Sequence, residues 1–222
     1  MPKVRGRTLR VLHSADEIAA RNLALAKEIA AAGYSNLLVV SVLKGSFVFA
    51  ADLIRALHGA GLAPEVEFIS LSSYQAGTKS SGKVKLVRDI ESDVRGRDVL
   101  LIDDILESGR TLSFARSLMV KRGARRVGVA VLLEKPGKLA QPMKADHVGF
   151  VVPDLFVVGY GMDVGHAFRE LPYVGVVEAT KTVRAGARDS RARTRAGWSR
   201  RAAAESRRKS RGHAAYRSRG EP

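Results

Sequence analysis

Residues 99–111, with the sequence VLLIDDILESGRT, constrain the fold of this chain more than any other stretch. The four apolar residues 99–102 predict a β-strand that is buried on both faces, as is typical of a parallel sheet. Asp103 and Asp104 follow this strand, and Ser108 and Gly109 indicate a short turn. Apolar residues at helical spacing then predict a helix from Thr111, with a glycine where a left-handed C-terminal cap would lie. These residues are Leu112, Ala115, Leu118, Met119 and Gly123.

A strand that ends in two carboxylates and turns into the start of a helix offers two kinds of ligand site. The backbone N–H groups of residues 106–111, helped by the hydroxyls of Ser108 and Thr111, can bind a phosphate, because a helix N-terminus favours anions. Asp103 and Asp104 cannot hold that phosphate, and they suit sugar hydroxyls or a divalent metal such as Mg²⁺. A ligand with a phosphate, a vicinal diol and a metal-bound polyphosphate would satisfy both halves.

This stretch resembles the phosphoribosyl-diphosphate binding motif of the type I phosphoribosyltransferases, and the match is better to their hypoxanthine-guanine branch. The resemblance extends over about residues 11–179. It implies an α/β fold with an open, mainly parallel twisted sheet, flanking helices and a small hood. It also implies a glycosyltransferase of purine salvage, which uses Mg²⁺ to transfer the 5-phosphoribosyl group from phosphoribosyl diphosphate to hypoxanthine or guanine. Members of the family typically form homodimers or homotetramers.

Composition limits the class of protein. A chain of 222 residues can hold one α/β domain with a large core or two small domains. It has no cysteine, which excludes disulfides, thiolate zinc sites and a thiol nucleophile and favours a reducing cytoplasm. No apolar run approaches the roughly 18 residues of a membrane span, and no signal-peptide core is visible. We therefore expect a soluble cytoplasmic protein.

The positive charge is concentrated near the C-terminus. Residues 183–222 contain 13 Lys and Arg against 3 Asp and Glu, which is net +10 of the +16 of the whole chain. This segment lacks Ile, Leu, Met and Phe, so it cannot bury enough apolar surface to offset its ordering entropy. We predict a phosphoribosyltransferase domain over residues 1–182, whose hood comes from the N-terminal segment and about residues 138–180. A disordered basic tail, able to contact nucleic acid without sequence specificity, follows over residues 183–222.

Patterns elsewhere predict alternating strands and helices, and hence a parallel sheet. Ser14 and Glu17 form a capping box ahead of a helix that ends at Gly33. We expect strands at 37–43, 65–71, 84–87 and 127–133, a helix from Ser46, a mobile polar loop at 72–83, and no long helix after 138. No internal repeat is visible.

The ligands of such sheets bind beyond the carboxyl ends of the strands, so polar residues that follow strands should meet there. The resemblance assigns phosphoribosyl diphosphate to Lys44, Gly45, Asp103, Asp104, Leu106, Ser108, Gly109, Arg110, Thr111 and Arg169. It gives Ser73 and Tyr74 to a loop that closes over the site. It gives the purine to Lys135, Phe156 and Val157, and Mg²⁺ to Asp163 together with Asp103 and Asp104. His147 and His166 show no metal-ligand spacing and are expected to be structural.

Glu107 departs from the commonest family pattern, which has Asp at this position as the base near purine N7. A glutamate can accept the same proton, but its carboxylate lies one methylene further from the backbone. We expect Glu107 to act as the catalytic base. The alternative is that it only completes the turn and favours the helix N-terminus.

Two other functions remain open. The first is a regulator on the same fold that controls nucleic acid, although only about 36 residues precede the first strand, too few for the extra N-terminal domain that such relatives usually carry. The second is another base specificity, for xanthine or a pyrimidine. Because oxo-purines share the contacts assigned to Lys135 and Val157, hypoxanthine, guanine and xanthine stay alternatives.

Overall fold

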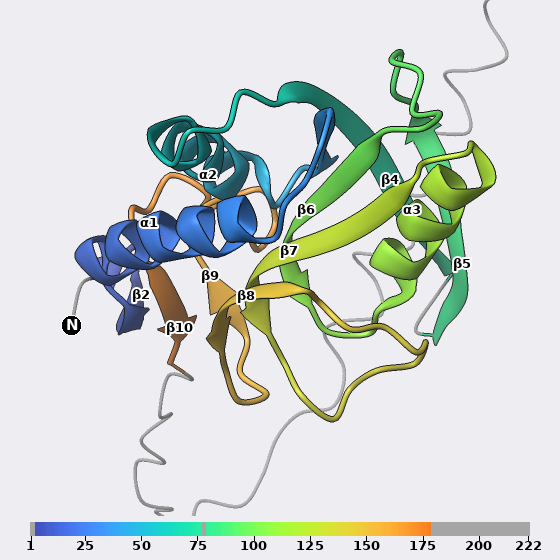
Figure 1. Cartoon of the computed structure of the whole chain (residues 1–222). Coiled ribbons are helices and arrows are strands. Elements are labelled where there is room, and N and C mark those ends of the chain that lie inside the picture. The colour runs from blue at the N-terminus through green and yellow to red at the C-terminus, as the bar shows by residue number, and fades with distance from the viewer. Residues whose placement is uncertain (1–2, 77–78, 179–222) are drawn as a thin grey trace, which may run out of the picture. The chain divides into compact units, whose positions relative to one another are not determined.

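A six-stranded sheet is the centre of this computed structural model, which describes residues 3–76 and 79–178, except for the side chains of Lys3 and of residues 73–83. In spatial order its strands are β5 (Lys79–Arg88), β4 (Glu65–Ala76), β3 (Leu37–Leu43), β6 (Asp98–Leu106), β7 (Arg126–Glu134) and β8 (His147–Val151). All neighbouring pairs are parallel except β4 and β5, which are antiparallel (Figure 1). The expected open, mainly parallel sheet is therefore present.

Three helices cover the two faces of this sheet. They are α1 (Ala15–Ala31), α2 (Phe47–Gly59) and α3 (Arg110–Lys121). Leu100 and Ile102 of β6 pack in one apolar cluster with α1 and α2, whereas Val99 and Leu101 pack in another with α3. Because successive side chains of a strand point to opposite faces, this buried run of β6 serves both layers.

The start of α1 confirms the predicted capping box. The Ser14 hydroxyl accepts a hydrogen bond from the Glu17 N–H at 3.3 Å, and the Glu17 carboxylate accepts one from the Ser14 N–H at 2.7 Å. Each bond satisfies a donor that has no partner inside the helix, so the first turn is fixed in place.

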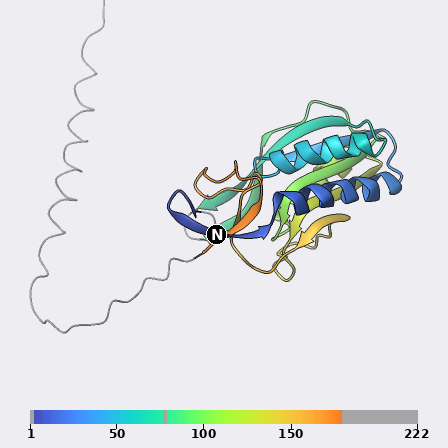
Figure 2. The same cartoon turned by 90° about the vertical axis from the view of Figure 1, so that its left-hand side faces the viewer.

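A small second sheet forms the hood. Its order is β1 (Lys3–Val4), β2 (Arg7–His13), β10 (Val174–Val177) and β9 (Val157–Val158), and all its neighbours are antiparallel. Figure 2 shows it at one end of the main sheet. Segments from the two ends of the described chain therefore pair with each other.

Residues 72–83, predicted as a mobile loop, belong largely to strands. Residues 72–76 continue β4 and residues 79–83 begin β5, with register shifts at Ser70/Leu71 and Ser73/Gln75. Their serine and glycine content indicated a loop, but antiparallel pairing is made by backbone groups and does not need apolar side chains.

Two further strands differ from the prediction. β6 does not end at residue 102: Asp103, Ile105 and Leu106 are all in register with β7, so the acidic pair lies within the strand. β8 was expected in the hood, yet it pairs with β7 in the main sheet, and Arg21 of α1 donates to the backbone oxygens of Val148 and Gly149 at 2.6 and 2.8 Å. The apolar side chains of β8, together with Arg21, hold this strand against the core of the main sheet.

The basic segment 183–222 lies outside the described residues. In the part of the chain that the structure describes, no helix is long and apolar enough to cross a membrane.

Candidate active site

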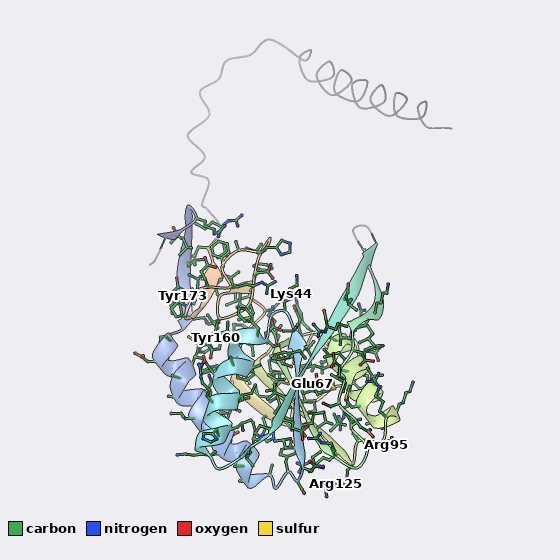
Figure 3. The ribbon with its side chains drawn as sticks, turned by 90° about the horizontal axis from the view of Figure 1, so that it is seen from above. Lys44, Glu67, Arg95, Arg125, Tyr160 and Tyr173 are labelled. Carbon is green, nitrogen blue, oxygen red and sulfur yellow. The ribbon has the colours of Figure 1, made fainter. Side chains whose placement is uncertain are left out.

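Three adjoining cavities open at the carboxyl ends of the parallel strands, and Asp104 lines all of them. Their volumes are about 270, 460 and 690 Å³, and we call them the turn cavity, the Phe156 cavity and the Lys44 cavity after residues that line them. Lys44 and Tyr160 lie toward the hood, and Arg95 and Arg125 lie at the opposite end of the molecule (Figure 3). The polar residues predicted to follow strands therefore meet at one end.

The turn cavity is bordered by the connection between β6 and α3. Gly109 has a φ of 73°, and a Cβ atom there would lie 2.9 Å from the Gln141 backbone oxygen. The Ser108 backbone oxygen accepts hydrogen bonds from the N–H groups of Ala140 at 2.9 Å and Gln141 at 3.2 Å. Thr111, in the first turn of α3, lines the same cavity. The segment that follows β7 thus fixes the turn from outside, and the start of α3 faces the cavity.

Leu106, the first residue of the predicted phosphate-binding stretch, lines the turn cavity at the end of β6, and its role toward a phosphate stays a prediction. Leu106 is in the ladder between β6 and β7, its backbone oxygen accepts from Lys135 N–H at 2.9 Å, and its side chain is buried. Arg110 is the first residue of α3, and its N–H lies 3.5 Å from the Ser108 hydroxyl. Residues 107–111 form the turn and helix start that a phosphate could contact.

Asp103 and Asp104 form an acidic pair at the end of β6, in which Asp103 is buried and Asp104 is half-buried. Asp103 is 7% exposed, and its carboxylate accepts a hydrogen bond from the Asp104 N–H at 3.0 Å. Burial raises the pKa of Asp103 well above its usual range, and the Asp104 carboxylate raises it further. Burial also raises the pKa of Asp104, an effect that Arg169 partly opposes. Two carboxyl groups that resist ionisation favour a bound cation or a ligand with hydroxyl donors.

The donor set at this pair fits a magnesium ion that a ligand shares. Among the described residues, no three acidic or histidine side chains converge to hold a metal on their own. Mg²⁺ commonly takes one or two carboxylates and completes its shell with water and substrate phosphates, so a pair is sufficient. The Asp163 carboxylate lies 2.6 Å from the Arg169 guanidinium and accepts from the His166 N–H at 2.7 Å. The negative charge of Asp163 is therefore already balanced in part by Arg169. The pair of Asp103 and Asp104 has the greater need of a bound cation.

The Lys44 cavity combines cations with very close backbone contacts. The peptide bond before Lys44 is cis, and a Cβ on Gly45 would lie 1.8 Å from the Asp104 carboxylate oxygen. A Cβ on Gly161, which has a φ of 98°, would lie 2.2 Å from the Gly45 backbone oxygen. Arg169 donates to the Gly161 backbone oxygen at 2.6 Å. Lysine and a forked arginine on one cavity suit a diphosphate.

The Phe156 cavity brings an aromatic ring to a buried lysine. Lys135 is 6% exposed, and its Nζ lies 3.4 Å from the Glu107 carboxylate. Phe156 is 60% exposed and lines this cavity, and Val157 beside it is buried. An open aromatic face next to a hydrogen-bonding lysine suits a flat heterocycle with a carbonyl group.

Comparison with known proteins identifies the family of this chain. The family model described as the phosphoribosyl transferase domain matches residues 11–164, which is more than half of the chain. The chain belongs to the phosphoribosyltransferase family.

Individual relatives agree with this membership. The bifunctional protein TilS/HprT of Listeria innocua is 44% identical over 170 residues; the match covers 76% of this chain and 26% of that protein, so the chain spans about a quarter of its length. The hypoxanthine-guanine phosphoribosyltransferase of Aquifex aeolicus is 41% identical over 181 residues, covering 80% of this chain and 99% of that one. A structure of Trypanosoma cruzi hypoxanthine phosphoribosyltransferase in complex with the product IMP has a TM-score of 0.73 and 34% identity, and covers 80% of this chain and 98% of its own.

Two predicted loop residues of this phosphoribosyltransferase are described only in part. The backbones of Ser73 and Tyr74 lie in β4, and their side chains are outside the described part of the structure. The neighbouring Ser72 lines the Lys44 cavity. Closure of this hairpin over the site stays a prediction.

The sequence reasoning missed Lys138 and Asp154, which line the Phe156 cavity of this phosphoribosyltransferase. Lys138 lies 2.6 Å from the Asp154 carboxylate and 3.8 Å from that of Glu107. The only signal in the sequence was their closeness to Lys135 and Phe156. His147 and His166, which were expected to be structural, each have a hydrogen-bond partner in the protein. His147 lies 3.2 Å from the Tyr34 hydroxyl, and the His166 N–H bonds to Asp163.

Proposed function

We propose that this phosphoribosyltransferase acts in purine salvage and transfers the 5-phosphoribosyl group from phosphoribosyl diphosphate to hypoxanthine or guanine, releasing pyrophosphate. The observation that carries the proposal is that three chemically different cavities share Asp104. The turn cavity suits the 5′-phosphate, the Phe156 cavity the base and the Lys44 cavity the diphosphate. The acidic pair between them suits the ribose hydroxyls.

Position and charge supply most of the catalysis in this proposal. The bond from the anomeric carbon of the ribose to the diphosphate loosens toward an oxocarbenium-like state, so the protein must hold the base close and stabilise the departing charge. Lys44 and Arg169 contact the diphosphate. Mg²⁺, held by Asp103 and Asp104 with Asp163 nearby, supplies further positive charge to that group when it is bound.

The base is recognised by the side chains of the Phe156 cavity. Lys135 donates to the 6-oxo group, the Phe156 ring covers the base, and the Val157 backbone meets the base edge. Glu107 accepts the proton near N7. The 3.4 Å separation of Glu107 and Lys135 supports this assignment, because the oxo group and N7 are neighbours on a purine.

Assembly and partners are part of the same proposal. We propose a cytoplasmic homodimer or homotetramer, in which residues 183–222 supply non-specific contact with nucleic acid. The net charge of +10 on that segment supports the contact with nucleic acid. The absence of cysteine from the chain supports the cytoplasmic location.

The direct test is an assay of pyrophosphate release by the purified protein with phosphoribosyl diphosphate, Mg²⁺ and one base at a time. We expect release with hypoxanthine or guanine and none with uracil or orotate. Pyrophosphate release only with a pyrimidine would change the proposed base specificity. A failure to release pyrophosphate with any of these bases would contradict the proposed enzyme activity.

A second test concerns the metal. Asp163→Asn is expected to raise the Mg²⁺ concentration needed for half-maximal turnover, because it removes a carboxylate from the Lys44 cavity. Asp154→Asn is the matched control, since Asp154 lines only the Phe156 cavity among the three. An equal Mg²⁺ requirement in wild type and Asp163→Asn would remove Asp163 from the metal site.

A further inference from the structure

Tyr160 is buried behind the Lys44 cavity and joins the helical layer to the site. Its side chain is 5% exposed, and its hydroxyl accepts a hydrogen bond from the Asn22 amide of α1 at 2.9 Å. The same hydroxyl donates its single proton to the carboxylate of Asp52 on α2. Burial and the Asp52 carboxylate raise the pKa of Tyr160, so the hydroxyl keeps this proton at neutral pH.

The two partners make a dedicated anchor. Asn22 is a polar residue in the middle of α1 and is 3% exposed, and its amide oxygen has no hydrogen-bond partner within the described residues. Asp52 is shared between Tyr160 and Arg55. A buried amide in an apolar helix face is unfavourable unless it makes a specific bond, and the bond Asn22 makes is the one to Tyr160.

The anchored tyrosine begins a tight turn. Tyr160 has a φ of 50°, a left-handed conformation that is uncommon for a residue other than glycine. Its N–H bonds to the Leu171 backbone oxygen at 2.8 Å, and the Gly161 N–H bonds to the Arg169 backbone oxygen at 3.1 Å. The turn is therefore tied to the segment that carries Arg169.

This turn touches the parts of the site assigned to the diphosphate. Gly161 packs against the Gly45 backbone and receives the Arg169 guanidinium on its own backbone oxygen. Arg169 also pairs with Asp163, two residues after Gly161. A displacement of Gly161 would therefore shift Arg169, Asp163 and the Gly45 loop together.

We propose that Tyr160 is a positioning residue for the diphosphate part of the site, and that Asn22 and Asp52 act through it to hold the 159–162 turn. The inference rests on the proposed function for its kinetic consequence alone. Tyr160 lines none of the three site cavities. It lines a fourth cavity of about 450 Å³ with residues of α1, α2 and the 169–172 segment, so its hydroxyl acts through the turn.

The test is Tyr160→Phe, which keeps the ring and removes the hydroxyl. We expect the KM for phosphoribosyl diphosphate to rise roughly tenfold while the KM for the purine stays within about twofold, since a lost buried hydrogen bond typically has an effect of this size. Asp52→Ala should reproduce this pattern. In Asp52→Asn the KM for phosphoribosyl diphosphate should stay near the wild-type value, because the amide oxygen can still accept a hydrogen bond from the Tyr160 hydroxyl.

Tyr34→Phe is the matched control. Tyr34 is also buried and also bonds through its hydroxyl, to His147, but it precedes β3 at the end of the sheet away from the site. It should lower stability without changing the KM for phosphoribosyl diphosphate. An unchanged KM in Tyr160→Phe, or an equal rise in Tyr34→Phe, overturns the positioning role.

Amide hydrogen exchange separates this inference from the proposed function. Without substrates, Tyr160→Phe should speed exchange in the 159–162 turn about tenfold or more and leave β7 unchanged. If the wild-type protein turns over no base, the proposed enzyme activity is refuted. The exchange result still decides whether Tyr160 holds the turn. Unchanged exchange at 159–162 overturns the inference in either case.

Discussion

The proposed role of Glu107 as the catalytic base depends on the reach of its side chain, which is one methylene longer than that of the aspartate commonest at this position in the family. Its carboxylate lies beside Lys135 and lines both the turn cavity and the Phe156 cavity. We expect Glu107→Gln, which keeps the shape and cannot accept a proton, to lower purine turnover by about 10²–10⁴-fold with little change in phosphoribosyl diphosphate affinity. Steady-state kinetics and calorimetric titration measure the two effects.

Glu107→Asp is the companion variant, because it keeps the carboxylate and shortens its reach. It should retain more turnover than Glu107→Gln if proton acceptance is the role. Wild-type turnover in Glu107→Gln would instead move the proton to water or to another residue.

The acidic pair is expected to lower stability in the absence of ligand. Because the pKa of Asp103 is raised in the folded protein, its ionisation at neutral pH opposes folding. Asp103→Asn keeps an oxygen for the Asp104 N–H, so it should raise the free energy of unfolding by roughly 0.5–2 kcal/mol at pH 7 while turnover falls. Urea unfolding without Mg²⁺ measures the change.

The difference in the free energy of unfolding between Asp103→Asn and the wild type should depend on pH. The advantage of Asp103→Asn should shrink as pH falls through the raised pKa, and vanish below the ordinary value of about 3.8, where Asp103 is protonated in both the folded and unfolded states. An advantage that persists at low pH would point to packing rather than charge.

The turn before α3 depends on Gly109. Its φ of 73° and the 2.9 Å approach to the Gln141 backbone oxygen leave no room for a side chain. Gly109→Ala should lower the free energy of unfolding by about 1–3 kcal/mol and weaken phosphate binding. Urea unfolding and titration with phosphoribosyl diphosphate measure these losses.

Gly59→Ala is the control for Gly109→Ala. Gly59 is the last residue of α2, and nothing lies within 4 Å of a Cβ placed there. The substitution should be neutral or stabilise slightly. Similar losses in both variants would mean that the Gly109 turn is not specially constrained.

Elements with a local signal could be predicted from the sequence, and those defined by pairing could not. All residues of β3 except Ser41 are apolar, and the Ser14 capping box marks the start of α1, so both elements could be predicted and agree with the structure. The outer part of the β4–β5 hairpin, residues 72–76 and 79–83, has few apolar residues, and its strands are paired by backbone bonds that composition does not reveal.

The same distinction applies to the site. The strand-end rule brought together Lys44, Asp104 and Lys135, which line the adjoining cavities, while their roles stay predictions. The contact of Gly161 with Gly45 and the bond of Tyr160 to Asp52 join residues more than 100 positions apart. No local pattern in the sequence encodes such contacts.

We expect the basic segment 183–222 to be separable from catalysis. Truncation after Thr182 should leave purine turnover nearly intact, because every cavity residue assigned to the site precedes it. It should also lower retention of DNA or RNA, whose dependence on salt should have a log–log slope of about −0.9 per phosphate contact on B-DNA. Salt-dependent binding assays on the full and truncated chains make the comparison.

Two results would contradict this separation. Full-length protein with no salt-sensitive retention of nucleic acid would leave the segment without that partner. Loss of purine turnover on truncation would show that the segment contributes to the folded domain.

The pairing of β2 with β10 determines when a newly synthesised chain can complete its fold. β2 is made among the first residues, yet its partner strand spans residues 174–177, so β2 has only the two-residue β1 beside it until almost the whole domain has emerged from the ribosome. Arg169 also emerges late, just before β10. A truncated or stalled nascent chain would therefore be inactive and would carry a strand with an open edge, a known route to aggregation.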